Sequence, residues 1–484
     1  MLVAAWWASG LVTGQTLAMD LQAAAEAHGL VGMSVVATCG AEVTDLYHYG
    51  LADIDDGIPV TDSTRYRIAS ISKLVTAIGL MRLWEQDLFE LDADVSTALG
   101  FTLRNPQFPN IPITYRMLLS HTGSLQDGTG YSDFLGSTYA SSPPPPISDL
   151  LLPGGPDYTA NMFRTEAPGT YYTYANVNFG VIGTLIEALS GQRFDVYMRT
   201  QVLEPLGIGG SFNVQDLDNI ANLAVLYRNS APQADNFNGA MPSPPDLGGY
   251  AIGTNGLYFG PQGGLRVTAL ELARIVLLLQ GEGTWNGTTL LQTSTVQLMM
   301  ADEWTWTGSN GDNYYGLFRS WGLGVHRATA QSAGDVVYPG TLMFGHPGEA
   351  YGLISDLYFD PASGAGLVFI TNGYTSGNAY ETGTASAFYT AEEAVFIALR
   401  THAFEACLNT GVPAFSDPLF PVVVSGNAIE WRGEGAASIF AFDTSGKECE
   451  RTVLSGPSRW SSKVSGVSLV RVCAQGKCRT YKLR

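Results

Sequence analysis

Hydrophobic positions along the chain change period twice, which predicts a sheet built from both ends of a domain with helices between. Residues 35–47 alternate between apolar and polar, and the apolar runs Leu353–Phe359 and Gly366–Thr371 also predict strands. The segments with helical spacing are Ile71–Trp84, Phe179–Leu189, Phe194–Val202, Ala269–Gln280 and Ala391–Ala403. The first is apolar around most of its circumference, so we expect that helix to be buried.

The first residues of the chain and two long irregular segments complete this picture. Residues 1–18 are moderately apolar but too short for a convincing membrane span. A trimmed or weak signal peptide is one interpretation, although no Lys or Arg stands before the apolar core as such a signal normally has. A helix is favoured there, with Leu17, Leu21, Ala24 and Ala25 facing a core. Residues 124–168 and 236–263 are rich in Gly and Pro, and we expect them to form loops over a site.

The length and the tail predict more than one domain. The chain has 484 residues, and beyond residue 410 it shifts to short β-like runs at 422–424, 437–442 and 467–472. We therefore expect a first domain at 1–404, with an α/β part and an all-α part whose helical insertion covers roughly 80–310. A small β-sandwich-like accessory domain would follow at 405–484.

Composition excludes some classes of partner. Asp and Glu outnumber Lys and Arg by 44 to 25, for a formal charge of −19, so a nucleic acid or an anionic membrane would be repelled. The six histidines are too scattered for a metal cluster, and we expect neither a metal nor a cofactor. No segment is expected to be an integral membrane span.

The five cysteines leave the redox state open. Cys473 and Cys478 bracket a plausible hairpin turn, so a disulfide across it is reasonable and would indicate an oxidising compartment. Four reduced thiols in the tail, Cys407 and Cys449 included, are about as plausible. A zinc site is less so, because that region has no histidine. Cys39 has no evident partner and is interpreted as structural.

A serine and a lysine three residues apart provide candidate chemistry. If a helix begins at Ser70, then Ser70 and Lys73 lie one turn apart on the same face, and Ser70 sits at the positive end of the helix dipole. A buried lysine with a lowered pKa can take the proton from a serine hydroxyl. The motif Ser-x-x-Lys by itself is common by chance.

Two further motifs could complete the site. Tyr174 could relay a proton and protonate a leaving group, while Asn176 could hold a substrate amide and the lysine. In Phe344-Gly-His-Pro-Gly348, His346 could anchor a carboxylate or steer the tyrosine, and Gly348 permits close backbone approach. The backbone N–H groups of Glu349 and Ser70 could then form an oxyanion hole.

The order of the three motifs resembles the serine β-lactamase and penicillin-binding-protein superfamily, in particular its class C branch, over roughly 21–400. Further segments support the resemblance: Tyr66-Arg-Ile-Ala-Ser-Ile-Ser-Lys73, Met117-Leu-Leu-Ser-His-Thr-Gly123, Ala167-Pro-Gly-Thr-Tyr-Tyr-Thr-Tyr-Ala-Asn176, Val202-Leu-Glu-Pro-Leu-Gly207, Gly263-Gly-Leu-Arg-Val-Thr-Ala269, Phe359-Asp-Pro361 and Thr371-Asn-Gly373. It implies a β-lactamase/DD-peptidase-like fold, an antiparallel sheet flanked by helices.

The resemblance also implies roles for the site residues. Ser70 would be the acylated nucleophile, Lys73 its partner and Tyr174 the general base and acid; Asn176 would contact substrate or Lys73. His346 stands where efficient class C β-lactamases carry a lysine, and Pro347 replaces a threonine that helps to bind a β-lactam carboxylate. Both departures disfavour a dedicated β-lactamase. His121, Asp62 and Glu166 are interpreted as structural.

We therefore expect a serine hydrolase that forms an acyl-enzyme and cleaves small esters or peptide-like amides, as carboxylesterases, DD-peptidases and D-aminopeptidases do. The alternatives are a β-lactamase, a slow penicillin-binding or sensing protein, and a surface-binding module whose function lies in the tail. The tail faintly resembles the C-terminal sorting domains of some secreted bacterial enzymes. It favours a secreted, periplasmic or cell-surface protein whose partner is a small molecule.

Overall fold

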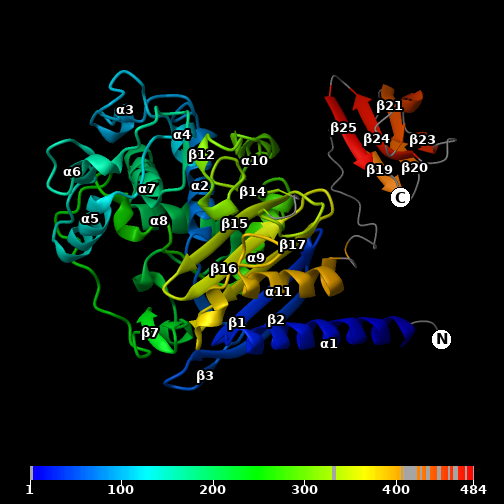
Figure 1. Cartoon of the computed structure of the whole chain (residues 1–484), viewed down its shortest axis with the longest axis horizontal. Coiled ribbons are helices and arrows are strands. Elements are labelled where there is room, and N and C mark those ends of the chain that lie inside the picture. Colours follow the sequence, from blue (N-terminus) through cyan, green and yellow to red (C-terminus); the bar gives the residue numbers. More distant parts are fainter. Residues whose placement is uncertain are drawn as a thin grey trace. The chain divides into compact units, whose positions relative to one another are not determined.

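The computed structural model describes residues 4–329, 334–404 and 407, and seven strands in the tail (Figure 1). The chain divides into two compact units: Met1–Pro361 with Ala365–Glu405, and Ala362–Gly364 with Ala406–Arg484. In the second unit, one sheet contains β19 (Val422–Ser425), β20 (Ala428–Trp431) and β23 (Ser458–Ser461). The other contains β22 (Glu448–Ser455), β21 (Ala436–Asp443), β24 (Val467–Ala474) and β25 (Lys477–Lys482).

A nine-stranded antiparallel sheet forms the framework of the first unit, and it combines both ends of that unit. Its strands, in spatial order, are β11 (Trp304–Thr305), β13 (Ser320–Trp321), β14 (His326–Ala328), β15 (Met343–Ala350), β16 (Leu353–Phe359), β17 (Ala365–Thr371), β1 (Gly32–Cys39), β2 (Glu42–Asp53) and β3 (Ile58–Pro59). The expected strands at 353–359 and 366–371 are confirmed as β16 and β17. Both are buried throughout, because helices cover the sheet.

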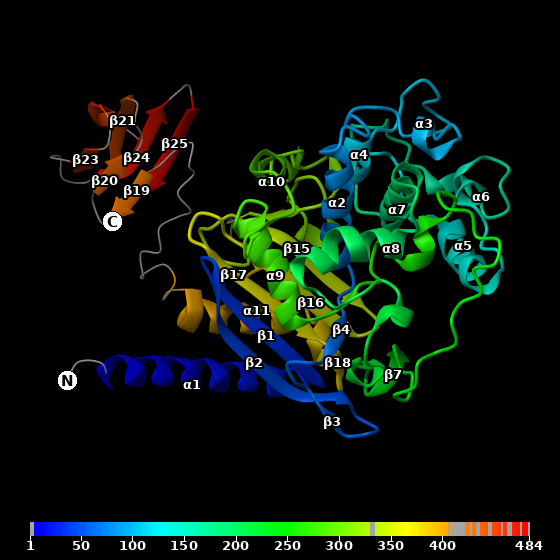
Figure 2. The same cartoon turned by 180° about the vertical axis from the view of Figure 1, so that it is seen from behind.

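Helices occupy both faces of the sheet and the region between β3 and β11. They are α1 (Ala4–Ala27), α2 (Ile71–Trp84), α3 (Ser96–Leu99), α4 (Tyr115–Leu119), α5 (Thr129–Ala140), α6 (Ser148–Leu151), α7 (Asn176–Ser190), α8 (Phe194–Met198), α9 (Ala269–Gln280), α10 (Thr293–Met299) and α11 (Thr390–Leu399). Helix α9 packs on β1, β16 and β17, whereas α1 packs against α11 (Figures 1 and 2).

Several sequence predictions agree with these helices. Helices α2 and α9 have the expected bounds, and α9 begins with a capping box between Thr268 and Glu271. At the N-terminal end, the expected helix is present and its predicted inward-facing residues Leu17, Leu21, Ala24 and Ala25 are buried. Among the described residues, no helix combines the length and apolar character that a membrane span requires.

Short ladders outside the main sheet place loops around the helices. Strand β4 (Arg65–Arg67) pairs with β8 (Arg266–Thr268), and β5 (Tyr172–Thr173) pairs with β12 (Gly311–Asp312). A third ladder joins β6 (Leu226–Arg228), β7 (Ala231–Ala234) and β18 (Gly373–Tyr374), and a hairpin joins β9 (Thr284–Trp285) to β10 (Thr288–Thr289). The first two ladders hold the segments that precede Ser70 and Tyr174.

Two expectations need correction. The segment 124–168 is not one long loop, because α5 and α6 lie within it; residues such as Phe134 and Leu150 are apolar and buried, and this favours helical packing over an irregular loop. Cys39 is not without a partner: Cys39 and Cys407 are both disulfide-bonded, so the alternative of four reduced thiols in the tail is wrong for Cys407. Cys473 and Cys478 lie opposite each other on β24 and β25, where a disulfide stays a prediction.

Candidate active site

A strained turn places Ser70 at the start of α2. The residue before it, Ala69, is buried and has a φ of 43°, a left-handed conformation that is uncommon for a residue with a side chain. Ser70 is the N-cap of α2, yet its side chain makes no capping hydrogen bond. A serine at the N-cap usually accepts a hydrogen bond from the helix backbone. Because Ser70 makes no such bond, its hydroxyl is available to other partners.

Lys73 lies one helical turn further on and is fully buried. Its Nζ donates to the Ser70 Oγ at 2.9 Å, to the Asn176 Oδ1 at 2.8 Å and to the backbone carbonyl of Gln262 at 2.8 Å. Burial lowers the pKa of Lys73 to about 7, although the negative charge of Asp127 acts in the opposite direction. At neutral pH a substantial share of Lys73 is therefore uncharged and can accept a proton.

Tyr174 follows β5, and its phenol lies beside the Ser70 side chain. The ring lies between those of His121, at 4.7 Å between centroids, and Phe318, at 4.9 Å, while the Nζ of Lys73 is 4.9 Å from its centroid. Burial raises the pKa of Tyr174, so the side chain remains a phenol and a proton donor at neutral pH. The Ser70 hydroxyl thus accepts a hydrogen bond from Lys73 and lies beside the phenol of Tyr174.

Asp127 holds Asn176 in place and was missed by the sequence analysis. One of its carboxylate oxygens accepts from the backbone N–H and the side-chain amide of Asn176, at 2.9 and 2.8 Å. The other accepts from the backbone N–H of Val177 at 2.9 Å, so Asp127 caps α7. This orientation of the amide leaves the Asn176 Oδ1 facing Lys73. The only signal in the sequence was the position of Asp127 within the segment 124–168.

His346 lies on β15 and is fully buried. Its Nδ1 donates to the carbonyl of Pro347 at 2.6 Å, while its Nε2 has no partner in the described part of the chain. Burial and the nearby charge of Lys73 hold the pKa of His346 well below its usual range, so the ring is neutral. Its centroid is 6.0 Å from that of Tyr174, and it does not line the cavity described below. Binding of substrate by His346 stays a prediction.

His121 is buried, and its ring contacts the backbone and side chains next to Tyr174. Its Nδ1 accepts from the backbone N–H of Ala175 at 3.2 Å and lies 3.0 Å from the amide nitrogen of Asn178. Because Nδ1 accepts from a backbone N–H, the hydrogen of the neutral ring is on Nε2. His121 therefore fixes the backbone next to Tyr174 and supports the tyrosine ring from one side.

Strand β15 approaches the turn before α2 at Gly348. A methyl group added at Gly348 would meet the Ser355 hydroxyl, the carbonyl oxygen of Ile68 at 2.7 Å and the backbone nitrogen of Ser70 at 3.1 Å. The Ser355 hydroxyl also donates to that carbonyl at 3.0 Å and so ties β16 to the same turn. Only glycine allows this approach.

The open edge of β15 faces this turn. Strand β14 pairs with β15 only as far as Gly345. Pro347 has no N–H with which to donate to β16, and its carbonyl oxygen accepts a hydrogen bond from the ring of His346 instead. The backbone polar groups at this position of the strand therefore face the open edge of β15 and not β16. Glu349 is two residues further on and has the same orientation in the strand. An oxyanion hole formed by its N–H and that of Ser70 stays a prediction.

We expect Gly348→Ala to lower the free energy of unfolding by about 1–3 kcal/mol, because an added methyl group must displace β15 or the Ser70 turn. Urea denaturation of the purified variant measures this change. Gly136→Ala is a matched control, since a Cβ at Gly136 in α5 meets nothing within 4 Å, and alanine there should be neutral or stabilising. Equal stability of Gly348→Ala and the wild type would contradict the close approach.

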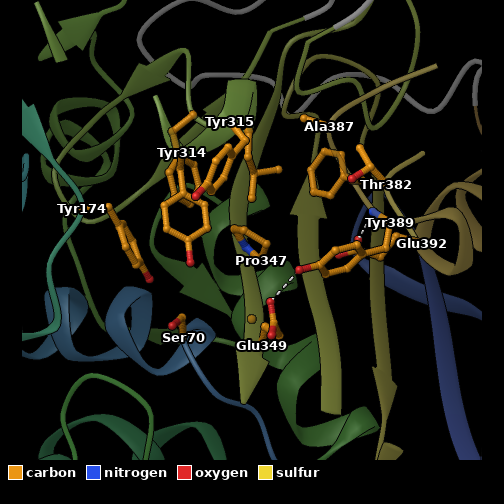
Figure 3. A pocket seen from close by; sticks show the side chains of 14 residues that line it. Ser70, Tyr174, Tyr314, Tyr315, Pro347, Glu349, Thr382, Ala387, Tyr389 and Glu392 are labelled. Carbon is orange, nitrogen blue, oxygen red and sulfur yellow. Dashed lines mark hydrogen bonds between the residues drawn. The ribbon is translucent and has the colours of Figure 1, made fainter. Parts of the chain in front are cut away.

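A cavity of about 270 Å³ opens beside Ser70 (Figure 3). Ser70 and Tyr174 lie on one side of it and Tyr389 and Glu392 on the other, with Pro347 between. Its lining consists of Ser70, Tyr174, Tyr314, Tyr315, Leu317, Phe318, Pro347, Gly348, Glu349, Thr382, Ala387, Phe388, Tyr389 and Glu392. Among the described residues, no group of His, Cys, Asp and Glu is arranged to hold a metal ion.

Comparisons with known proteins agree with this fold. Penicillin-binding protein 4 of Amycolatopsis lactamdurans is 24% identical over 338 residues, which is 69% of this chain and 76% of that protein. The matched segment spans only about a third of the length of two further curated relatives, penicillin-binding protein 4* of Bacillus subtilis (strain 168) and protein flp of Staphylococcus aureus (strain N315).

Solved structures show the same fold. The D-amino acid amidase of Ochrobactrum anthropi SV3 superposes with a TM-score of 0.60 at 19% identity, over 80% of this chain and 97% of that one. EstCE1, a hydrolase with promiscuous acyltransferase activity, gives a TM-score of 0.56 at 23% identity, over 80% of this chain and all of its own. The family model for β-lactamase matches residues 17–391. This chain therefore belongs to the β-lactamase family, in which it resembles a penicillin-binding protein in sequence and shares its fold with a hydrolase and a D-amino acid amidase.

Proposed function

We propose that this protein is a serine hydrolase that cleaves small esters or peptide-like amides through an acyl-enzyme on Ser70. The observation that carries the proposal is the surroundings of one hydroxyl: the Lys73 Nζ lies 2.9 Å from the Ser70 Oγ, and the phenol of Tyr174 lies beside the same serine. A nucleophile within reach of a base, with a second proton carrier beside it, is the arrangement that acyl transfer needs.

The chemistry proceeds in two steps. Uncharged Lys73 takes the proton of Ser70 as the Oγ attacks the substrate carbonyl, and the oxyanion is stabilised by the N–H groups of Ser70 and Glu349. Tyr174 gives its proton to the leaving group as the bond to the carbonyl carbon breaks, and Lys73 restores that proton. Water then attacks the ester on Ser70 and releases the acid, with proton transfer through the same groups.

Trapping the acyl-enzyme tests this function. The protein is mixed with a short-chain nitrophenyl ester or with benzylpenicillin, and its intact mass is measured over time while the free reagent is followed. We expect release of nitrophenol and an acyl adduct that maps to Ser70. A lasting penicillin adduct would place the protein with the penicillin-binding relatives, and consumption of penicillin without an adduct would make it a β-lactamase. Reaction with neither reagent would contradict the proposal.

The rate of acylation should depend on the protonation of Lys73. Because only the uncharged amine can accept the serine proton, kcat/KM should fall about tenfold per pH unit below the pKa of about 7 and level off above it. Initial rates with a neutral nitrophenyl ester between pH 5 and 9, corrected for spontaneous hydrolysis, measure this profile. A flat profile between pH 5 and 7 would contradict Lys73 as the base.

We also infer that the protein works in an oxidising compartment, secreted, periplasmic or at the cell surface. The support is that Cys39 and Cys407 are both disulfide-bonded, since such bonds are rare in the reducing cytosol. Counting free thiols with and without a reductant, in the denatured protein, tests this inference. Five reactive thiols before reduction would contradict it.

A further inference from the structure

The cavity beside Ser70 has an acidic and aromatic wall that the proposed reaction does not use. Among the residues that line it, two are acidic, Glu349 and Glu392, and none is basic. The Glu349 side chain is exposed, and its carboxylate accepts a hydrogen bond from the Tyr389 hydroxyl at 2.7 Å. Figure 3 shows these groups across the cavity from Tyr174. The electrostatic character of this wall favours a cation and disfavours an anion.

Glu392 belongs to a second, buried acidic pair behind the wall. Asp356 is fully buried against it, and neither oxygen of the Asp356 carboxyl finds a donor among the other described residues. Burial raises the pKa of Asp356 and also that of Glu392, the latter to about 8, so both carboxyl groups favour the neutral form. A positive charge placed in the cavity would favour ionisation of this pair, and the pair would then attract that charge.

Aromatic rings complete the wall on the side of the cavity mouth. Tyr315 is 98% exposed, and Tyr314 and Tyr315 have φ values of 51° and 59°. Two successive left-handed residues with large side chains cost free energy, about 1 kcal/mol or more each, and such strain persists mainly where a site requires it. The side chain of Asn313 accepts from the Gly316 N–H at 3.1 Å and stabilises this turn. Rings beside carboxylates are the surroundings that bind ammonium groups.

The position of Tyr174 indicates which half of a substrate would occupy this space. In the proposed reaction Tyr174 protonates the leaving group, so that group must lie next to the tyrosine hydroxyl. The cavity is lined by Tyr174 but not by Asn176, and it runs from Tyr174 past Pro347 toward Tyr389 and Glu392. It is therefore the space for the leaving group, whereas the acyl half lies elsewhere.

We propose that this cavity binds a positively charged alkylammonium on the leaving group of the substrate, held by Glu349 and Glu392 and enclosed by Tyr314, Tyr315 and Tyr389. This inference rests on the proposed function and names its substrate class: esters or amides whose leaving group is cationic. The same wall repels a leaving group that carries a carboxylate, as the products of carboxypeptidases do.

Three thioesters with one acyl group test the proposal. They are acetylthiocholine, its neutral isostere 3,3-dimethylbutyl thioacetate, and the anionic S-acetyl-3-mercaptopropionate; released thiol is measured with a disulfide reagent. Because all three form the same acetyl-enzyme, differences in kcat/KM report acylation and leaving-group binding alone. We expect kcat/KM to fall about tenfold from cation to neutral compound, and about tenfold again to the anion.

Substitutions of the two acidic residues test whether the wall causes the preference for a cationic leaving group. In Glu349→Gln and Glu392→Gln, the ratio of kcat/KM for the cationic thioester to kcat/KM for the neutral thioester should fall several-fold. Because both substrates are measured on the same variant, any effect on folding or on the chemical step cancels in this ratio. Glu381→Gln removes the same charge from an exposed residue that does not line the cavity, and it should keep the wild-type ratio. A wild-type ratio of one or less, or a ratio that survives in both wall variants, overturns the proposal.

A binding measurement separates this inference from the proposed function. Calorimetric titration of Ser70→Ala protein with acetylthiocholine and with the neutral thioester reads recognition without turnover, and we expect tighter binding of the cation. Turnover of the neutral thioester without preference for the cation would overturn the inference and leave the serine hydrolase intact. Tighter binding of the cation without hydrolysis of any thioester by the wild type would contradict the hydrolase instead.

Discussion

Replacing Ser70 with alanine should abolish hydrolysis of a nitrophenyl short-chain ester, with kcat/KM at least about 10³-fold below that of the wild type. The reason is that no other hydroxyl group takes its place: the Lys73 Nζ at 2.9 Å from Oγ would face a methyl group, and no acyl-enzyme could form. Initial rates at saturating and limiting ester concentrations measure the loss, and the intact mass after reaction should show no adduct.

The fold should tolerate this change. The Ser70 side chain makes no capping bond to α2, so alanine removes no support from the helix, and thermal unfolding should be close to that of the wild type. Ser63→Ala is a matched control, because Ser63 is exposed and its hydroxyl contacts only that of Thr61 in the part of the chain that the structure describes. Retention of most activity by Ser70→Ala would refute the whole assignment of the site.

Replacing Tyr174 with phenylalanine should lower kcat/KM by about 10²–10⁴-fold, which is the usual contribution of a general acid or base. Phenylalanine keeps the ring between His121 and Phe318 but removes the phenol hydroxyl that lies beside Ser70. The loss should be smaller for esters with a good leaving group such as nitrophenolate than for alkyl esters or amides, because a good leaving group needs less help from an acid. Rates on such a series measure the difference.

Tyr172→Phe provides the matched control for this experiment. Tyr172 is two residues away and fully buried, and its hydroxyl has no hydrogen-bond partner within the described residues. Removal of that hydroxyl should leave kcat/KM within a few-fold of the wild type. If Tyr174→Phe were as active as Tyr172→Phe on alkyl esters, Tyr174 would not carry a proton in the rate-limiting step.

The bounds of the buried elements were within reach of sequence reasoning because burial leaves a periodic trace. Helices α2 and α9 have the predicted ends, and β16 and β17 follow the predicted apolar runs. The segment 124–168 was misjudged because glycine and proline mark its ends and breaks, and the apolar residues of α5 and α6 are sparse between them. Local pattern was too weak there to outweigh composition.

The contacts of the candidate site are likewise of two kinds, those that the sequence predicts and those that depend on the tertiary structure. The spacing of Ser70 and Lys73 on one helix is local, and the sequence by itself determined that they meet. The sequence also singled out Tyr174, Asn176 and Gly348 as members of one motif set. Contacts across long separations were decided only by the tertiary structure, because no local period records them: Asp127 on Asn176, the Gln262 carbonyl on Lys73, and the acidic wall of Glu349 and Glu392.

The pKa of Lys73 shows most clearly what the sequence contributes and what the tertiary structure contributes. Its place in a Ser-x-x-Lys motif is written in the sequence, but a lysine in water titrates near 10.4 and cannot serve as a base at neutral pH. Packing of α2, α7 and the loop at Gln262 removes water from the amine and lowers its pKa to about 7. The sequence alone indicated the family, the order of the motifs and the candidate reacting side chains. Only the tertiary structure decided how deeply those groups are buried and what charge surrounds them, because solvent exclusion depends on residues that are distant along the chain.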